Sequence, residues 1–143
     1  MLYSKATKGE MFLKRIIKPS VIFLIGFIGY YSIELAARGF SHWTMGLCGG
    51  ICLIRIYSTN RKYRHLPLTF RAIICAFFIT FIEFVAGCLL NLWLGLNIWD
   101  YSALPYNILG QISLTFSSLW FYLSFAICGI ISFGENLRQR QRI

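Results

Sequence analysis

The chain has 143 residues, of which 57% are hydrophobic and 13% are charged, and its mean hydropathy is +0.64. This composition is too apolar for an ordinary soluble domain, and the length is too short for several domains. The formal net charge is +9, from 14 Lys and Arg against five Asp and Glu. The sequence therefore predicts a single transmembrane domain with an all-α fold, and the lipid bilayer is its first expected partner.

Four apolar runs predict a bundle of four transmembrane helices. They cover residues 19–37, 42–57, 72–96 and 108–133. A helix rises about 1.5 Å per residue and the hydrocarbon core is about 30 Å thick, so the first, third and fourth runs are long enough to cross. The second run reaches across only marginally. We expect it to cross where the bilayer is thinned, and a partly re-entrant segment is the alternative.

Basic residues flank these runs unevenly. Thirteen of them lie before the first run, around the loop between the second and third runs, or at the C-terminal end. They are Lys5, Lys8, Lys14, Arg15, Lys18, Arg55, Arg61, Lys62, Arg64, Arg71, Arg138, Arg140 and Arg142. Only Arg38 falls on the opposite side. Cytoplasmic loops carry an excess of Lys and Arg, so we expect both termini to be cytoplasmic. The same rule explains the net charge without a nucleic-acid partner.

Polar residues in the third run mark the first candidate site. Glu83 lies near the middle of that run, where a charge costs at least about 2.5 to 3.5 kcal/mol on insertion scales. Glu83, Gly87 and Asn91 are spaced four apart, so they share a helix face that must point at protein or water. Arg55 is the best-placed partner for an ionised Glu83, and protonation is the other way to relieve the charge. A structural and a functional role for Glu83 both stay open.

Glu34 and Arg38 form a second polar pair, near the outer end of the first run. An acid four residues before a base lies on the same side of a helix in the favourable order, which predicts a salt bridge. The Gly39-Phe40 pair that follows is expected to end the helix.

The segment between the third and fourth runs is rich in turn formers and aromatic residues. Trp99 and Tyr101 suit the aromatic belt at a lipid interface. Asp100 is the only acid in this segment. Asn107 is expected to cap the fourth helix, with Gln111 one turn further along on the same face. Turn formation alone does not require the amide of Gln111, so we regard it as a candidate site residue.

These residues resemble those of a family of small bacterial membrane proteins described as "putative ABC-transporter type IV", or permease-like. In that family an intramembrane Glu is followed by a Trp-Asp-Tyr-Ser element and then by spaced Asn, Gly and Arg or Gln. The matching residues here are Glu83, Trp99, Asp100, Tyr101, Ser102, Asn107, Gly110 and Gln111. Arg38-Gly39-Phe40 is similar to an earlier Arg-Gly-Phe element, so the resemblance covers about residues 29–130. Two departures are Asn91, where a second acid is frequent, and Ile98, which replaces a Trp.

The resemblance favours a permease-like subunit that moves a small solute. Glu83, Asn91 and Gln111 would line its path, and Arg38 and Asp100 would stand at the outer mouth. The sequence contains no GxxxxGK[ST] loop, so ATP-driven transport would require a separate ATPase subunit, expected to dock on the basic loop 55–71. Four spans also favour a homo-oligomer.

The alternative function is a non-transporting adaptor or sensor that binds a partner protein. We expect no enzymatic activity, because no nucleophile and base pair is evident. We also expect neither a cofactor nor a metal. Cys48 and Cys52 share a helix face, but no histidine or acid stands beside them, so packing is the favoured role.

Overall fold

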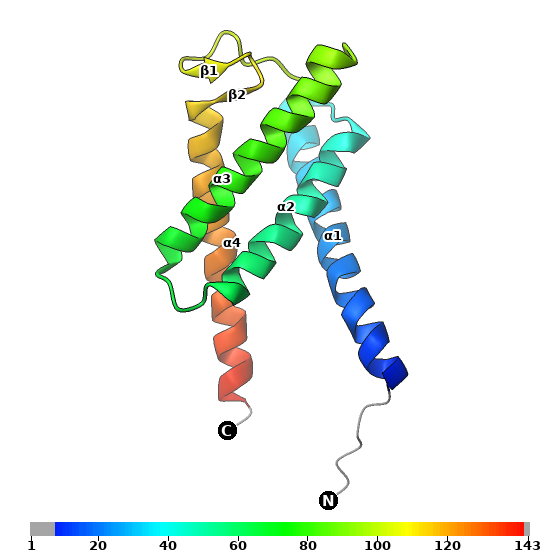
Figure 1. The fold of residues 1–143 in the computed structure, drawn as a ribbon, viewed down its shortest axis with the longest axis vertical. Coiled ribbons are helices and arrows are strands. Elements are labelled where there is room, and N and C mark those ends of the chain that lie inside the picture. The colour runs from blue at the N-terminus through cyan, green and yellow to red at the C-terminus, as the bar shows by residue number, and fades with distance from the viewer. Residues whose placement is uncertain (1–7, 142–143) are drawn as a thin grey trace, which may run out of the picture.

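The structure is a computed structural model that describes residues 8–141 of the chain, with side chains from Ile16 onward. Four helices run alternately up and down between two ends, which confirms the all-α, four-helix fold (Figure 1). We call the end that carries the small hairpin the upper end, and the end where α1 starts and α4 stops the lower end. Lys5 and Arg142, two of the basic residues counted above, lie outside the described residues.

Helix α1 (Lys8–Arg38) starts well before the first apolar run, so that Pro19 lies inside it. The helix ends where the sequence predicted. Gly39 has a φ of +75°, and its N–H donates to the carbonyl of Leu35 at 2.9 Å. Glycine adopts this left-handed conformation without steric cost, which is why it terminates helices.

Helix α2 (Trp43–Lys62) packs closely on α1 through glycines, whose lack of a side chain lets the two backbones approach. A Cβ on Gly26 would lie only 2.6 Å from the carbonyl oxygen of Gly49. Gly46 and Gly50 meet phenylalanine rings of α1 at similarly short distances. The glycines of α2 therefore form its contact face with α1, and they make α1 and α2 one tight hairpin.

Helix α3 (Leu68–Gly87) passes directly into the π-helix η1 (Cys88–Trp93). The third helical segment therefore ends at Trp93 and not at Leu96 as predicted. Gly95, with a φ of +66°, follows it as the chain turns back. Single π-turns are rare and occur frequently at functional sites.

The chain then forms a short antiparallel hairpin of β1 (Asn107–Ile108) and β2 (Ile112–Ser113) before helix α4 (Leu114–Arg140). The hydroxyl of Ser113 accepts a hydrogen bond from the N–H of Phe116 at 3.4 Å and caps α4. The prediction that Asn107 caps a helix beginning at residue 108 is wrong. The hairpin takes up the residues that the apolar pattern assigned to the first turn of that helix.

Large apolar side chains cover the outside of the molecule. Phe77 is 77% exposed, and Ile130 is 72% exposed. Among the described residues, three helical segments are long and apolar enough to cross a membrane: Ile16–Arg38, Leu68–Trp93 and Leu114–Arg140. The chain is therefore a multi-pass membrane protein whose apolar surface faces lipid.

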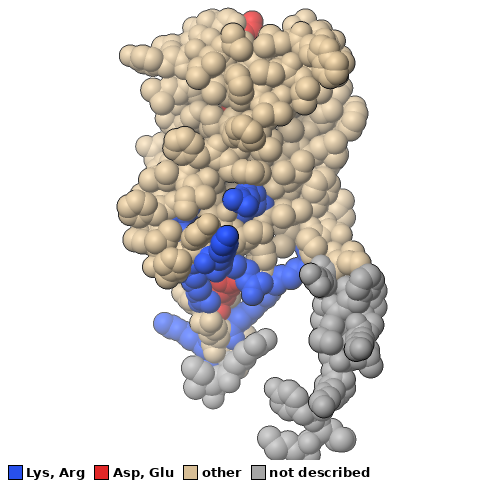
Figure 2. Space-filling view, in the orientation of Figure 1, with Lys and Arg blue, Asp and Glu red and all other residues tan. Residues whose placement is uncertain are grey.

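Basic side chains gather toward the lower end of the molecule, whereas the upper part of the same view shows none (Figure 2). One base at this end is internal. Arg71 is 8% exposed, and its Nη1 donates to Asn60 Oδ1 at 2.6 Å and to Ser132 Oγ at 3.0 Å. Its two neutral acceptors come from α2 and α4, so this guanidinium of α3 ties three helices together.

Candidate functional site

The carboxylate of Glu83 lies inside the molecule, where two aromatic side chains donate hydrogen bonds to it. The Tyr101 hydroxyl donates to Oε1 at 3.0 Å, and the Trp120 indole Nε1–H donates to Oε2 at 2.8 Å. Glu83 is 7% exposed. The side chain thus connects α3 both to the segment that follows it and to α4, and both partners are neutral donors.

Aromatic packing positions the two donors. The Tyr101 ring stacks on Phe116 at a centroid distance of 4.3 Å, and the Trp120 ring lies 5.8 Å from the ring of Tyr30 on α1. Burial, and secondarily the nearby Glu83, raise the pKa of the Tyr101 phenol above its ordinary value. The phenol therefore keeps its proton and remains a donor at physiological pH.

The predicted pairing of Glu83 with Arg55 is wrong. The guanidinium of Arg55 lies 5.1 Å above the ring of Phe78 instead. The physical reason is that Glu83 already has two donors closer at hand, while an aromatic face offers Arg55 a favourable site without reaching the bilayer centre.

The amides of Asn91 and Gln111 meet directly, although they are 20 residues apart. Asn91 Nδ2 donates to Gln111 Oε1 at 2.9 Å and to the Trp99 carbonyl at 3.0 Å, while Asn91 Oδ1 accepts the Ile98 N–H at 2.7 Å. The Trp99 indole N–H donates to the Gln111 carbonyl at 2.9 Å. These bonds fasten the segment after η1 onto the top of α3.

Gly87 makes this contact possible. A Cβ at this position would lie 2.6 Å from Gln111 Oε1 and 2.8 Å from Gln111 Cβ. Gly87 was correctly predicted to share the inward face of Glu83, and the space left by its missing side chain is filled by Gln111. Gln111 itself lies in the hairpin and not on α4, so the prediction that it shares a helix face with Asn107 is wrong.

Asp100 and Asn107 build the turn at the upper end. Asp100 Oδ1 accepts hydrogen bonds from the backbone N–H and the hydroxyl of Ser102, which lower the pKa of this exposed carboxyl. Asn107 donates to the Leu104 carbonyl at 2.8 Å and accepts the Gly110 N–H at 3.1 Å. Both polar side chains therefore stabilise the loop conformation.

The predicted salt bridge between Glu34 and Arg38 is confirmed, with Arg38 Nη1 3.2 Å from Glu34 Oε1. The second carboxylate oxygen accepts the Ser41 hydroxyl at 2.9 Å. Arg38 Nη2 also donates to the Ile98 carbonyl. The pair consequently joins the end of α1 to the segment that carries Trp99.

Three cavities follow one another between α1 and α4. The upper cavity, of about 520 Å³, includes Glu34, Arg38, Asp100 and Tyr101 in its lining. The central cavity has about 350 Å³ and the lower cavity about 530 Å³. Tyr30, Ile33, Trp99, Trp120 and Leu123 line both the upper and the central cavity, and Ile130 and Ile131 line both the central and the lower cavity.

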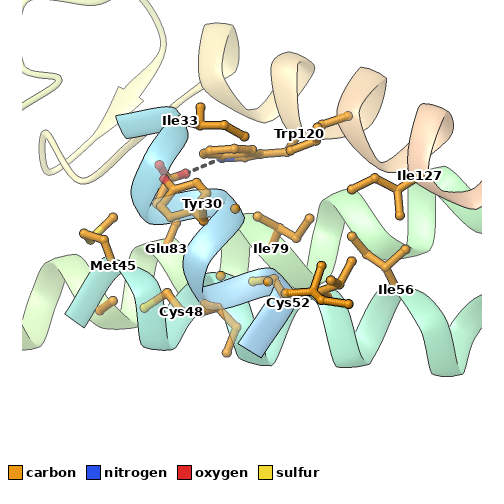
Figure 3. Close-up of a pocket in the computed structure, with 18 of the residues that line it drawn as sticks. Tyr30, Ile33, Met45, Cys48, Cys52, Ile56, Ile79, Glu83, Trp120 and Ile127 are labelled. Atoms are coloured by element: carbon orange, nitrogen blue, oxygen red, sulfur yellow. Dashed lines mark hydrogen bonds between the residues drawn. The ribbon is translucent and has the colours of Figure 1, made fainter. Parts of the chain in front are cut away.

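The central cavity is apolar except for a few groups. Figure 3 shows Glu83 hydrogen-bonded to Trp120 beside Tyr30, with Met45, Cys48 and Cys52 along the α2 wall. Glu83 is the one charged residue among the described residues that line this cavity. A carboxylate framed by aromatic rings in an apolar space can orient one polar group of a bound molecule.

The eight residues singled out from the sequence thus divide into three groups. Glu83, Glu34, Arg38 and Asp100 line cavities. Asn91, Gln111 and Asn107 are absent from all three linings and fasten the upper segment, which corrects the prediction that Asn91 and Gln111 line a path. Arg55 alone forms the third group, because its guanidinium lies over the ring of Phe78.

Sequence reasoning missed the residues that hold the carboxylate. Trp120 was not considered as a site residue, and Tyr101 was interpreted as an interfacial aromatic and a member of the family pattern but not as a donor to Glu83. One signal was available: Trp120 lies near the middle of a long apolar run, where its indole N–H must find a partner away from the interfaces.

The fold and this site define a polytopic α-helical membrane protein that encloses an internal carboxylate in an aromatic-lined cavity. The family model described as "Putative ABC-transporter type IV" matches residues 21–138. The chain belongs to this family, as the Glu83 and Trp99–Gln111 pattern predicted. No curated protein and no solved structure matches the chain.

Proposed function

We propose that the chain is a permease-like subunit that moves a small amphipathic solute through the crevice between α1 and α4. The observation that carries the proposal is the succession of upper, central and lower cavities, each sharing lining residues with the next. Glu83 is the polar group halfway along. The apolar walls favour a solute with an apolar body, and the Glu83 carboxylate would orient its polar group.

The topology that goes with this function places the lower end in the cytoplasm and lets α2 cross the membrane with the other three helices. The basic residues toward the lower end support this orientation by the positive-inside rule. A separate ATPase subunit would dock on the basic segment 55–71, and the chain would work as a homo-oligomer in a bacterial inner membrane. We assign it no enzymatic activity.

Native cysteines provide a test that needs no knowledge of the solute. Cys48 lines the central cavity, whereas Cys128 is fully buried in the helix core. Full-length variants that keep only one of these two cysteines are reconstituted in sealed vesicles. A membrane-impermeant methanethiosulfonate is then added to one side at a time.

A permease exposes its central site to water alternately from each side, so Cys48 is expected to react from both sides and Cys128 from neither. Unreactive Cys48 on both sides, in protein that remains folded and inserted, would overturn the permease proposal and favour the adaptor. Reaction of Cys128 at the same rate as Cys48 would indicate general unfolding of the reconstituted protein and would equally remove support for a defined path.

A further inference from the structure

The lower cavity, where α1, α2 and α4 meet, is strongly basic. Its lining contains Lys18, Arg61, Arg64 and Arg138 together with one acid, Glu135, so that four positive charges and one negative charge leave a formal +3. Figure 2 shows acidic atoms surrounded by basic side chains at this end. The cavity of about 530 Å³ is large enough for a phosphate group and its ester substituents.

These charges are only partly satisfied within the part of the chain that the structure describes. Glu135 is shared between two bases, with Oε1 3.7 Å from Arg61 Nε and Oε2 3.8 Å from Arg64 Nη1. Lys18 Nζ and the Arg61 guanidinium also lie against the same ring, that of Tyr57, at 5.1 and 5.8 Å from its centroid. Both cations therefore lie near one ring of the cavity lining, and an anion bound in the cavity would be attracted by both.

An apolar wall begins directly above the basic residues of the lower cavity. Ile130 and Ile131 line the lower and central cavities alike, and Ile25 and Leu53 continue the apolar wall on α1 and α2. Ile130 is largely exposed, so this wall is accessible from the side of the molecule. A ligand that fits both halves needs an anionic head and an apolar tail.

We propose that the lower cavity is a specific site for an anionic phospholipid. The bases hold the headgroup phosphate, and one acyl chain extends along Ile130 and Ile131 into the crevice between α1 and α4. This lipid site is independent of the proposed transport function, because a non-transporting adaptor could bind the same lipid. An inorganic phosphate shares the head chemistry but would not use the apolar wall.

The test measures lipid binding to the purified full-length chain in mild detergent by native mass spectrometry. Phosphatidylglycerol and phosphatidylcholine of equal chain length compete in equal amounts. One phosphatidylglycerol per chain is expected to be retained in preference. Arg61→Gln and Arg138→Gln should each weaken its binding about fivefold, the factor that corresponds to about 1 kcal/mol for each base near an anionic lipid. Arg138 has no ion pair among the described residues, so its variant leaves the Glu135 contacts intact.

Lys62→Gln is the matched control, because it removes the same charge beside Arg61 but outside the cavity lining. An equal loss in Lys62→Gln, or no preference for phosphatidylglycerol, would overturn the specific site. Ile130→Ser should weaken phosphatidylglycerol binding but leave the affinity for inorganic phosphate unchanged. If millimolar inorganic phosphate displaces the lipid and Ile130→Ser has no effect, the cavity is an anion site and not a lipid site.

Discussion

Replacing Gly87 by alanine is expected to destabilise the protein, although alanine is the better helix former. The added Cβ would meet the side chain of Gln111 at 2.6 to 2.8 Å, a distance at which something must move. Gln111 is 3% exposed and hydrogen-bonded to Asn91, so it has little room to yield. The expected result is partial release of the segment that carries Tyr101 from the top of α3.

The size of the effect follows from three contributions. Overpacking costs about 1 to 3 kcal/mol. Loss of the bond between Asn91 and Gln111 costs about 0.6 to 1.7 kcal/mol in a membrane protein. Glycine replacement within a helix recovers about 0.5 to 1 kcal/mol. The net loss of roughly 1 to 4 kcal/mol corresponds to a Tm lower by roughly 3 to 13 °C for a chain of this size.

Thermal unfolding of the purified protein in detergent, followed by tryptophan fluorescence, measures this change. Gly29→Ala is the matched control, because a Cβ on that helical glycine meets nothing within 4 Å. It should leave Tm unchanged or raise it slightly. A Gly87→Ala protein as stable as Gly29→Ala would refute the reasoning that position 87 must lack a side chain to accommodate Gln111.

Two further predictions concern the carboxylates. In a double-mutant cycle of Glu83→Leu with Tyr101→Phe, the 3.0 Å hydrogen bond should appear as a coupling of about 0.6 to 1.7 kcal/mol in thermal stability. The same cycle with Tyr106→Phe, at a residue 81% exposed, should give none, and equal couplings would contradict the assigned bond. The second prediction is a pH dependence at Asp100. Hydrogen bonds from Ser102 lower the pKa of Asp100 in the folded protein below the ordinary value of 3.8. The ionised carboxylate therefore stabilises the fold at pH values above 3.8. This stabilisation is lost as the pH falls through the lowered pKa of the folded protein. Wild type should therefore exceed Asp100→Asn in Tm at pH 7, and the difference should close below about pH 4; a constant difference across this range would exclude the mechanism.

The helices and the local ion pair could be predicted because their causes lie close together in the sequence. Apolar runs of sufficient length give the four helices, and a spacing of four places Glu34 beside Arg38. The end of α1 could also be predicted, because Gly39 by itself provides the left-handed conformation that terminates the helix. Gly87 and Glu83 were correctly assigned to an inward face, since a helix period alone defines that face.

The partners of Glu83 could not be predicted in the same way. Tyr101 and Trp120 come from separate elements, and only the folded chain brings their donors to the two carboxylate oxygens. Asn107 illustrates another limit. An asparagine side chain satisfies free backbone N–H groups equally well at a helix start or within a turn, so its residue type does not decide between them.

The third limit is the π-helix. Residues 88–93 continue the apolar pattern of α3 without a glycine or proline to mark a change. Within this π-helix, Asn91 is hydrogen-bonded to the backbone of Ile98 and Trp99. These contacts form only when the chain has folded back after η1. A local pattern predicts an uninterrupted helix here because it contains no information on that return.

The glycine contact between α1 and α2 has a consequence for the synthesis of the protein. Every residue of that contact belongs to one contiguous hairpin, from Phe23 to Leu53. This hairpin leaves the ribosome before α3 does, so its two helices can pair before α3 reaches the bilayer. Glu83 and Arg71, the two polar groups of α3 that are costly to place in lipid, therefore meet an already assembled α1–α2 surface when they enter the bilayer.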